Sequence, residues 1–423
     1  MRYLTFMRVH ELFNESRAFS DDVTGRPSRQ LTVSGLYNQT PTYHLNTAFT
    51  ADSRYLVFAT AREGGSAIVK AEMSTGELTV LAVTDGIGAG SALQGFAGPW
   101  CAGSAGGGHN GNGMAVLQAS NMVASVLGRS LRVYDLDTGA ERILIGDVGA
   151  AYRFGNPVGS IDGRHIFVTR APEHPDLVAG MPRAERGYFA ACTATFGGMP
   201  TDYLKVDIST GAVEVIFHED VYGNNHIQPC PADPELLLID RDAPPLFAHG
   251  SDGGKTTRCW TLDTRTNALT EIAPRDENGF QIHTNWDRTG TRIYYHGRSA
   301  REGNPIFTPN GGHYIGVADR SGATLWEGWF PVFNYGHVST HTQADAIITD
   351  GLLTPDMVTA IHYTDLDATG TPRIEILARH NTLWDSVIGQ YAHPHCHMSP
   401  DGRWLSYNRG EKGRTNLCVV QVG

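Results

Sequence analysis

Short apolar runs separated by turn sequences recur along the whole chain. In each repeat an apolar run leads through a turn such as P-D-G to a second run, and a third run leads through a D-x-x-T/S-G turn to a fourth. Short runs with alternating polar positions, bounded by Gly, Pro and Asp, are typical of antiparallel β-strands. The repeat occurs at 48–83, 118–146, 158–219, 227–274, 283–329, 337–379 and 395–423.

Seven copies of a four-stranded antiparallel unit predict an all-β fold, a seven-bladed β-propeller. The seventh copy has only three apolar runs, and the run at 28–35 is expected to be the N-terminal strand that closes the ring in the last blade. Residues 1–25 are then an N-terminal extension. Because no linker rich in Pro, Ser or charge divides the chain, we expect a single domain over residues 1–423 rather than two separate β domains.

Charge and composition exclude several classes of partner. The formal net charge is −11, whereas nucleic-acid-binding proteins present basic surfaces to phosphates, so we expect no nucleic-acid partner. The six cysteines show no C-x-x-C spacing, which argues against a zinc knuckle or a disulfide framework. The sequence has no signal-peptide pattern and no apolar run long enough to cross a membrane, so we expect a soluble, cytoplasmic protein without a membrane partner.

The predicted propeller brings dispersed polar residues to one place. All innermost strands run the same way, so their first residues gather around one mouth of the central channel. The second strand returns to that mouth, and the third strand therefore also begins there. The residues expected at this mouth are His226, His283 and His337 at the starts of three repeats, His393 and His395 just before and at the start of the last repeat, and Arg258 at the start of a third strand.

The most specific of these segments is Q-x-x-H-x-H, which contains Gln390, His393 and His395. Pro394 keeps the segment out of a helix, and a loop there would let these side chains converge with His337 of the neighbouring repeat. Three neutral imidazoles and an amide oxygen form a ligand set for a borderline divalent cation, and these ligand types do not distinguish Mn²⁺ from Zn²⁺, Ni²⁺ or Co²⁺. Histidines also cap strands and bond loop carbonyls, so a structural role stays open.

Several segments together resemble the oligogalacturonate lyases, which are seven-bladed propeller polysaccharide lyases that cleave short pectin fragments. The similar segments are YHLNTAFTADSRYLVF, HIQPCPADPELLLI, RCWTLD, HTNWDRTGTRIYYHG, and QYAHPH before MSPDGRWLSYN. They occur in order from about residue 25 onward, and the resemblance is patchy between 84 and 220. It implies a divalent metal, described as manganese, held by His337, Gln390, His393 and His395, with His283 as the group for proton abstraction and Arg258 as the group that stabilises charge.

The resemblance further implies β-elimination at a 4-linked uronic acid, with an anionic oligosaccharide as the substrate. Removing the C5 hydrogen places a second negative charge beside an ionised carboxylate, and a metal together with Arg258 would stabilise that charge. His283 would take the C5 proton, since an imidazole is a suitable base near neutral pH. Cleavage of the 4-O bond would then leave a 4,5-unsaturated sugar. His226 and Arg298 are candidate substrate contacts, with packing or hydrogen bonding as the alternative role.

The sequence also departs from the family. In GHVSTHTQAD, which begins the sixth repeat, His341 competes with His337 as the metal ligand. The glycine-rich insert 98–113 and the segment 174–200 do not match the family, and such loops commonly shape a binding face. The substrate therefore stays open between oligogalacturonides and other uronate polymers, such as ulvan or glycosaminoglycan fragments.

Other interpretations predict different features. A non-enzymatic propeller that serves as an interaction platform would present aromatic and apolar residues at the rim instead of histidines. A serine hydrolase would need a G-x-S-x-G elbow, which the segment GGSAI at 64–68 lacks. Arg258 could form a surface ion pair with Asp240 or Asp242. We expect Tyr43 and His44 to lie in the first inner strand, where His44 has a structural role.

Overall fold

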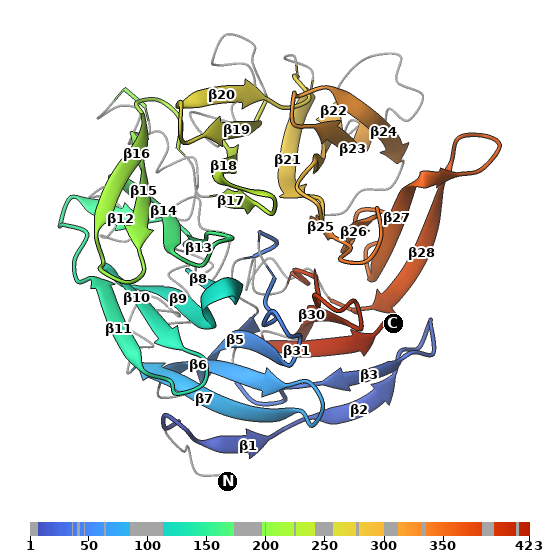
Figure 1. The fold of residues 1–423 in the computed structure, drawn as a ribbon. Helices are drawn as coiled ribbons and strands as arrows, with labels where there is room; N and C mark the ends of the chain where they lie inside the picture. Colours follow the sequence, from blue (N-terminus) through green and yellow to red (C-terminus); the bar gives the residue numbers. More distant parts are fainter. Residues whose placement is uncertain are drawn as a thin grey trace.

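The computed structural model describes residues 7–423 except 36, 40–42, 46, 63–64, 85–112, 173–196, 199, 224–225, 242–256, 276–278, 300–311, 331–335, 383–392 and 412–413. The described residues form β-strands and one short 3-10 helix, Gln118–Ser120. Seven antiparallel sheets stand around a central axis in chain order, as Figure 1 shows. The predicted seven-bladed β-propeller is confirmed. Among the described residues, no helix is both long and apolar enough to span a membrane.

The first four blades occupy the N-terminal half of the ring. Blade 1 contains β4 (Tyr37–Gln39), β5 (Tyr55–Arg62), β6 (Gly65–Glu72) and β7 (Glu77–Thr84). Blade 2 contains β8 (Met114–Leu117), β9 (Met122–Leu127), β10 (Ser130–Asp135) and β11 (Glu141–Ile145). Blade 3 contains β12 (Tyr152–Phe154), β13 (Val158–Gly159), β14 (His165–Pro172), β15 (Thr201–Asp207) and β16 (Val213–Glu219). Blade 4 contains β17 (Ile227–Cys230), β18 (Asp233–Asp240), β19 (Cys259–Asp263) and β20 (Ala268–Glu271).

The last three blades complete the ring. Blade 5 contains β21 (Gly279–Trp286), β22 (Arg292–Ser299), β23 (Gly312–Asp319) and β24 (Thr324–Phe330). Blade 6 contains β25 (Val338–Thr340), β26 (Ile347–Thr349), β27 (Met357–Leu366) and β28 (Pro372–Arg379). Blade 7 contains β29 (His397–Met398), β30 (Trp404–Glu411) and β31 (Arg414–Gln421) from the end of the chain.

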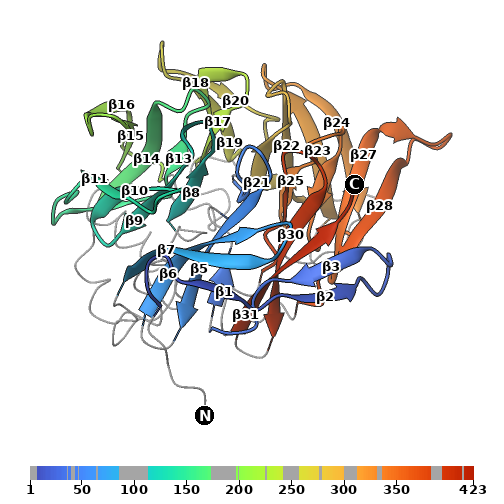
Figure 2. The ribbon, with the colours of Figure 1, turned by 60° about the horizontal axis from the view of Figure 1, so that its bottom comes forward.

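An N-terminal strand closes the ring, as the sequence predicts. In blade 7, β3 (Pro27–Gln30) pairs antiparallel with β31, and β2 (Arg17–Ser20) adds a further strand outside it. The strand is shorter than the expected 28–35 and begins one residue earlier. β1 (Leu12–Asn14) pairs with β7 of blade 1, so the segment expected as an extension contributes edge strands to two blades. Figure 2 shows these three strands along the outside of the ring.

Each sheet packs against the sheets of the two neighbouring blades, so both of its faces are covered. The hydrophobic core therefore lies between neighbouring blades. In β6, seven successive residues are buried, and all of them except Lys70 are small or apolar, so this middle strand does not show the alternation of a half-exposed strand. One core cluster joins Leu31 and Leu417 of the last blade region to Phe49 and Phe58 of the first. Apolar packing between the last and first blades therefore stabilises the ring closure, in addition to the hydrogen bonds between β3 and β31.

The inner strand of blade 1 is interrupted. β4 pairs with β5, and the chain meets β5 again at the isolated bridge between Phe49 and Leu56. Tyr43 and His44 lie between these two points in a turn, and Tyr43 has a φ of 60°. The expectation that both residues belong to the first inner strand is therefore wrong. The interruption carries both rings into the cluster of histidines on the propeller axis.

Candidate functional site

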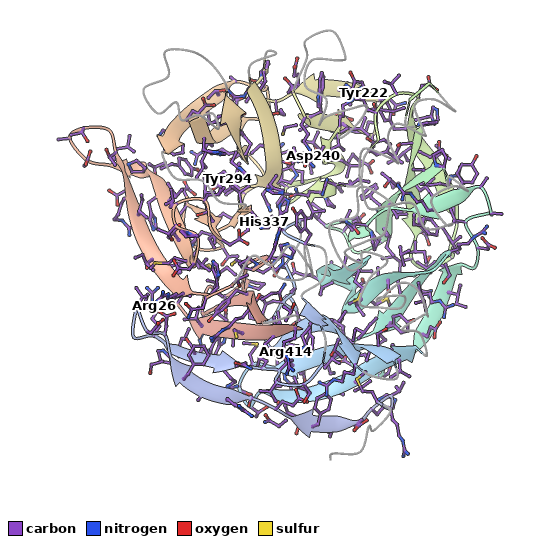
Figure 3. The ribbon with its side chains drawn as sticks, turned by 180° about the vertical axis from the view of Figure 1, so that it is seen from behind. Arg26, Tyr222, Asp240, Tyr294, His337 and Arg414 are labelled. Carbon is purple, nitrogen blue, oxygen red and sulfur yellow. The ribbon has the colours of Figure 1, made fainter. Side chains whose placement is uncertain are left out.

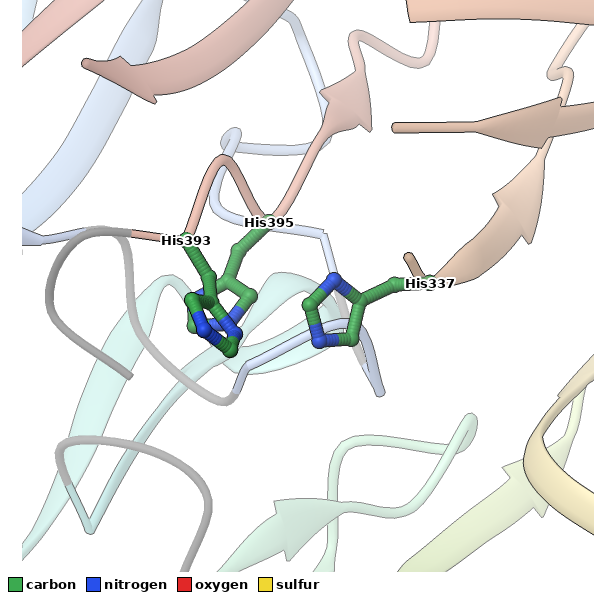
Figure 4. A group of neighbouring side chains, drawn as sticks. All are labelled: His337, His393 and His395. Carbon is green, nitrogen blue, oxygen red and sulfur yellow. The ribbon is translucent and has the colours of Figure 1, made fainter. Parts of the chain in front are cut away.

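Three histidines from two adjacent blades face one another at the axis. His337 lies directly before β25, and His393 and His395 lie in the loop before β29. Each offers one ring nitrogen, and these atoms lie within 4.8 Å of one another. Figure 4 shows the His337 ring opposite the pair from the next blade, and Figure 3 places His337 near the axis. We call His337, His393 and His395 the histidine trio.

A buried carboxylate holds one member of the trio. Nδ1 of His337 donates to Oδ2 of Asp350 at 3.0 Å, and the backbone N–H of His337 donates to Oδ1 at 2.6 Å. Asp350 is 1% exposed and His337 is 3% exposed. A carboxylate accepts the Nδ1 proton, which leaves the Nε2 lone pair of His337 available as a ligand.

The other two members are held in the uncharged form. Burial, followed by the proximity of His337, lowers the pKa values of His393 and His395 well below the ordinary value. A neutral imidazole is the form that binds a metal. The donor atoms, their spacing and the carboxylate behind His337 therefore fit a borderline divalent cation. Nitrogen ligands alone do not distinguish manganese from zinc, nickel or cobalt.

The loop that carries His393 and His395 is fixed by strand β30. The backbone N–H of Asn408 donates to the carbonyl of Pro394 at 2.7 Å, and its side chain donates to the carbonyl of His393 at 3.3 Å. His395 has a φ of 46°, a sparsely populated backbone conformation for a residue with a side chain. A bend in place of a regular strand brings both rings toward His337.

The alternative ligand His341 lies elsewhere. Its ring is 6.2 Å from that of His362, and its Nδ1 accepts hydrogen bonds from the backbone N–H groups of Gln343 and Ala344. The group of histidines with metal-ligand spacing contains His337 and not His341. Gln390, the fourth expected ligand, lies outside the described residues.

His283 stands beside the trio on a bulge in β21. The register of β21 with β22 shifts between Ile282 and Thr284, and His283 has a φ of 44°. Its ring centroid lies 4.5 Å from that of His337. Burial, followed by the neighbouring His337 and His44 rings, lowers the pKa of His283 well below the ordinary value.

Arg258 is also at this mouth, directly before β19. Its Nη2 lies 3.0 Å from Nδ1 of His226 and 3.5 Å from Oδ2 of Asp240. Oδ1 of Asp240 accepts a hydrogen bond from Thr284 at 2.7 Å. The ion pair with Asp240 is thus present, but it is buried rather than on the surface, since Arg258 is 6% exposed and Asp240 0% exposed.

Some of the expected site lies outside the part of the chain that the structure describes. The backbone of Arg298 belongs to β22, whereas its side chain is outside the described atoms. Asp242 falls outside as well. Of the inserts at 98–113 and 174–200, only residues 113, 197–198 and 200 are described.

The sequence interpretation missed several residues of the cluster. The ring of Tyr43 lies 4.8 Å from that of His337 and 4.6 Å from that of His395, and its hydroxyl contacts His283. The supporting carboxylate Asp350 was missed too, and Asp240 was expected only as a surface partner of Arg258. Both come at the end of a buried second strand, in LLLID and AIITD, and the blade topology returns such positions to the mouth where the histidine trio lies. That signal could have found them.

A cavity of about 170 Å³ lies on the axis beside the cluster. Inner segments of blades 1, 4, 5, 6 and 7 line it, including His44, Gln228, Asn285, Thr340 and His397. Both ring nitrogens of His44 and Nε2 of His397 are buried without a hydrogen-bond partner among the described residues. Burial lowers the pKa of His397 to about 4. The cavity is thus lined by uncharged imidazoles, which can accept hydrogen bonds from water.

No protein-family model matches the chain, and no curated protein sequence matches it either. Solved structures do. Oligogalacturonate lyase from Vibrio parahaemolyticus is 18% identical with a TM-score of 0.72, and the match covers 98% of this chain and 99% of that chain. A structure of oligogalacturonate lyase in complex with manganese is 19% identical with a TM-score of 0.73, and the match covers 99% of each chain. The chain has the oligogalacturonate lyase fold.

The expected resemblance to oligogalacturonate lyases is thus confirmed over the whole propeller at the level of the fold. A weaker likeness extends to hydrazine synthase from Kuenenia stuttgartiensis, with 11% identity and a TM-score of 0.54 over 91% of this chain and 96% of that chain. Propellers of related shape therefore serve different chemistries, and the residues at the mouth must decide the function.

Proposed function

We propose that this protein is a metal-dependent lyase that cleaves short uronic-acid oligosaccharides by β-elimination, with oligogalacturonides as substrates. One observation carries the proposal: three histidines with metal-ligand spacing stand next to a buried neutral imidazole, His283, at one mouth of the propeller. The oligogalacturonate lyase fold supports the choice of substrate class.

The proposed reaction needs a base and a stabilised carboxylate. The C5 hydrogen of a uronate is poorly acidic because its loss adds negative charge next to an ionised carboxylate. His283 is uncharged and so can accept the C5 proton. The electrons of the C–H bond then form the C4–C5 double bond as the C4–O4 bond breaks, and the leaving oxygen takes a proton. No water is consumed.

Arg258 and His226 would bind the substrate carboxylate as a pair. An arginine only donates hydrogen bonds, so Nδ1 of His226 accepts from Arg258 and the proton of a neutral His226 lies on Nε2. Asp240 holds the guanidinium from behind. Two donors from one blade are thereby oriented together, which fixes the carboxylate against rotation. Arg298 is proposed as a further substrate contact.

The histidine trio, with Gln390 as a fourth proposed ligand, would hold the cation. A bound divalent cation would supply electrostatic stabilisation of the charge that develops on the substrate carboxylate, an effect worth several kcal/mol. Manganese is the proposed metal, and the oligogalacturonate lyase with manganese supports that choice. Asp350 orients the His337 ring toward this position.

The test is a direct assay. Metal-loaded protein is incubated with digalacturonate and trigalacturonate, and the ultraviolet absorbance of the 4,5-unsaturated product is followed. We expect absorbance to rise, and to stop rising after chelation or in His393→Ala. Mass spectrometry of the products checks that mass is conserved, as elimination requires, whereas hydrolysis would add one water.

Parallel reactions with ulvan and glycosaminoglycan oligomers compare the uronate classes. A faster rise with one of these would replace oligogalacturonides as the substrate while retaining elimination. A metal-loaded protein that is inert toward every uronate oligomer would contradict the proposal.

A further inference from the structure

The hydroxyl of Tyr43 lies 2.5 Å from Nε2 of His283. Both residues are buried, with exposed fractions of 1% and 8%. The contact joins two points 240 positions apart in the sequence, on blades 1 and 5. It places a phenol at the ring nitrogen through which the proposed base would act.

The protons of this contact can be assigned from the partners of His283. Its Nδ1 lies 2.9 Å from the carbonyl oxygen of Gly336. A carbonyl only accepts hydrogen bonds, so Nδ1 carries the proton of the neutral ring. Nε2 of His296, at 2.8 Å from the same Nδ1, is then a second acceptor. Nε2 of His283 is therefore the bare nitrogen, and Tyr43 is the donor to it.

The lone pair of His283 is consequently covered by Tyr43. The Tyr43 ring meets the rings of His337 and His395 edge-on, so the phenol lies among the histidine trio as well as against His283. A proton moving from a substrate at the trio to Nε2 of His283 would have to pass the Tyr43 oxygen. We infer that Tyr43 is a further catalytic residue, which relays the proton from C5 of the substrate to His283, an inference that rests on the proposed lyase function.

The relay balances as a single chain of transfers. The C5–H bond breaks and its proton bonds to the Tyr43 oxygen, while the hydroxyl proton of Tyr43 moves to Nε2 of His283. The electron pair of the C5–H bond forms the C4–C5 double bond, and the C4–O4 bond breaks with its electrons on O4. Protonation of O4 and loss of the Nε2 proton restore both residues. No oxidant, reductant or additional reactant is involved.

The backbone around Tyr43 is anchored for this position. The side chain of Asn285 donates to the carbonyl of His44 at 2.7 Å, and His397 forms a hydrogen bond with the backbone of Tyr43. Tyr43 and His283 both have positive φ values, 60° and 44°. Such sparsely populated conformations persist only where surrounding contacts impose them. The strained pair is a feature of the site.

The first test replaces only the hydroxyl. In Tyr43→Phe the ring and its packing remain, so we expect unchanged Mn²⁺ affinity and thermal stability, KM within about twofold, and kcat lowered by roughly 10²- to 10⁴-fold. Tyr294→Phe is the matched control, because Tyr294 is fully buried in the core between blades 5 and 6. Its kcat should equal that of the wild type.

The second test reads the proton positions without any substrate. The ring ¹⁵N shifts of His283 are measured in zinc-loaded full-length protein and assigned by their loss in His283→Gln. We expect a protonated Nδ1 and an unprotonated, hydrogen-bonded Nε2, whose shift moves toward that of a free nitrogen in Tyr43→Phe. A protonated Nε2 in the wild type overturns the relay.

The outcomes separate the two proposals. An active wild type together with an equally active Tyr43→Phe overturns the relay and leaves the lyase function standing. A wild type inert toward all uronates overturns the lyase function, and the relay falls with it.

Discussion

Asp350 and His337 form a buried carboxylate–imidazole pair, with Oδ2 3.0 Å from Nδ1. The same carboxylate also accepts the backbone N–H of His337, so it fixes both the chain and the ring. Partners of this kind typically change metal affinity by about 10- to 100-fold. We therefore predict that Asp350→Ala weakens Mn²⁺ binding by about that factor, measured by isothermal titration calorimetry.

Asp345→Ala serves as the comparison for Asp350→Ala. Asp345 forms ion pairs with Arg288 and Arg292 at a partly exposed position. Replacing it should leave the metal affinity unchanged. Equal affinities in all three proteins would show that the carboxylate does not support a ligand.

Substitution of the two candidate ligands of the sixth blade, His337 and His341, should have opposite effects on metal binding. His337 belongs to the histidine trio, whereas His341 packs against His362. We expect His337→Ala to abolish stoichiometric metal binding in elemental analysis, because two remaining imidazoles from one loop form a poor site. His341→Ala should retain the metal, and the reverse pattern would reassign the ligand.

The closing strand should control the stability of the whole ring. Leu31 follows β3 and is fully buried in the cluster that joins the last blade region to the first. Leu31→Ala is expected to lower the free energy of unfolding by about 2–5 kcal/mol, measured by denaturant titration. Val23→Ala, at a position 42% exposed, should change it little. A small effect of Leu31→Ala would mean that the closure contributes little.

The carboxylate of Asp21, in the turn after β2, ties this turn to the end of blade 6 and should make the stability of the fold depend on pH. Burial alone would raise the pKa of its carboxyl, but hydrogen bonds from the backbone N–H groups of Arg379 and Thr24 outweigh burial and hold the pKa below 3.8. A lowered pKa in the folded state stabilises the protein above the ordinary pKa, and this stabilisation is lost as the pH falls through the lower value.

We accordingly predict that Asp21→Asn is less stable than the wild type near neutral pH. The difference in free energy of unfolding should shrink as the pH is lowered past the pKa of the folded state. Thermal unfolding at several pH values measures the trend. A difference that is constant with pH would assign the effect to packing.

The blades were predictable because every blade repeats the same local information. Alternation and turn chemistry act over a few residues, and the D-x-x-T/S-G turns recur as hydrogen-bonded loops, such as Thr138 and Thr210 donating to Asp135 and Asp207. The meeting of His226, Arg258 and His283 followed from topology alone, since strand direction dictates which ends share a mouth. The approximate position of the closing strand followed from counting strands.

The finer arrangement of the site depends on contacts that no local pattern encodes. Regular alternation assigns Tyr43 to a strand, whereas its position results from contacts with His283 and His397, which lie more than two hundred positions away. The bend at His395 likewise depends on Asn408 holding the preceding loop. By contrast, Asp350 was within reach of sequence reasoning, because it follows a buried strand whose end the topology places at the mouth.

Ser28 of the closing strand pairs with Val420, so this strand can join its sheet only late in translation. The strand that contains Ser28 leaves the ribosome first. It stays unpaired while nearly four hundred further residues are translated. His393 and His395 lie before β29 of the same blade, so the histidine trio is among the last parts of the described fold to form.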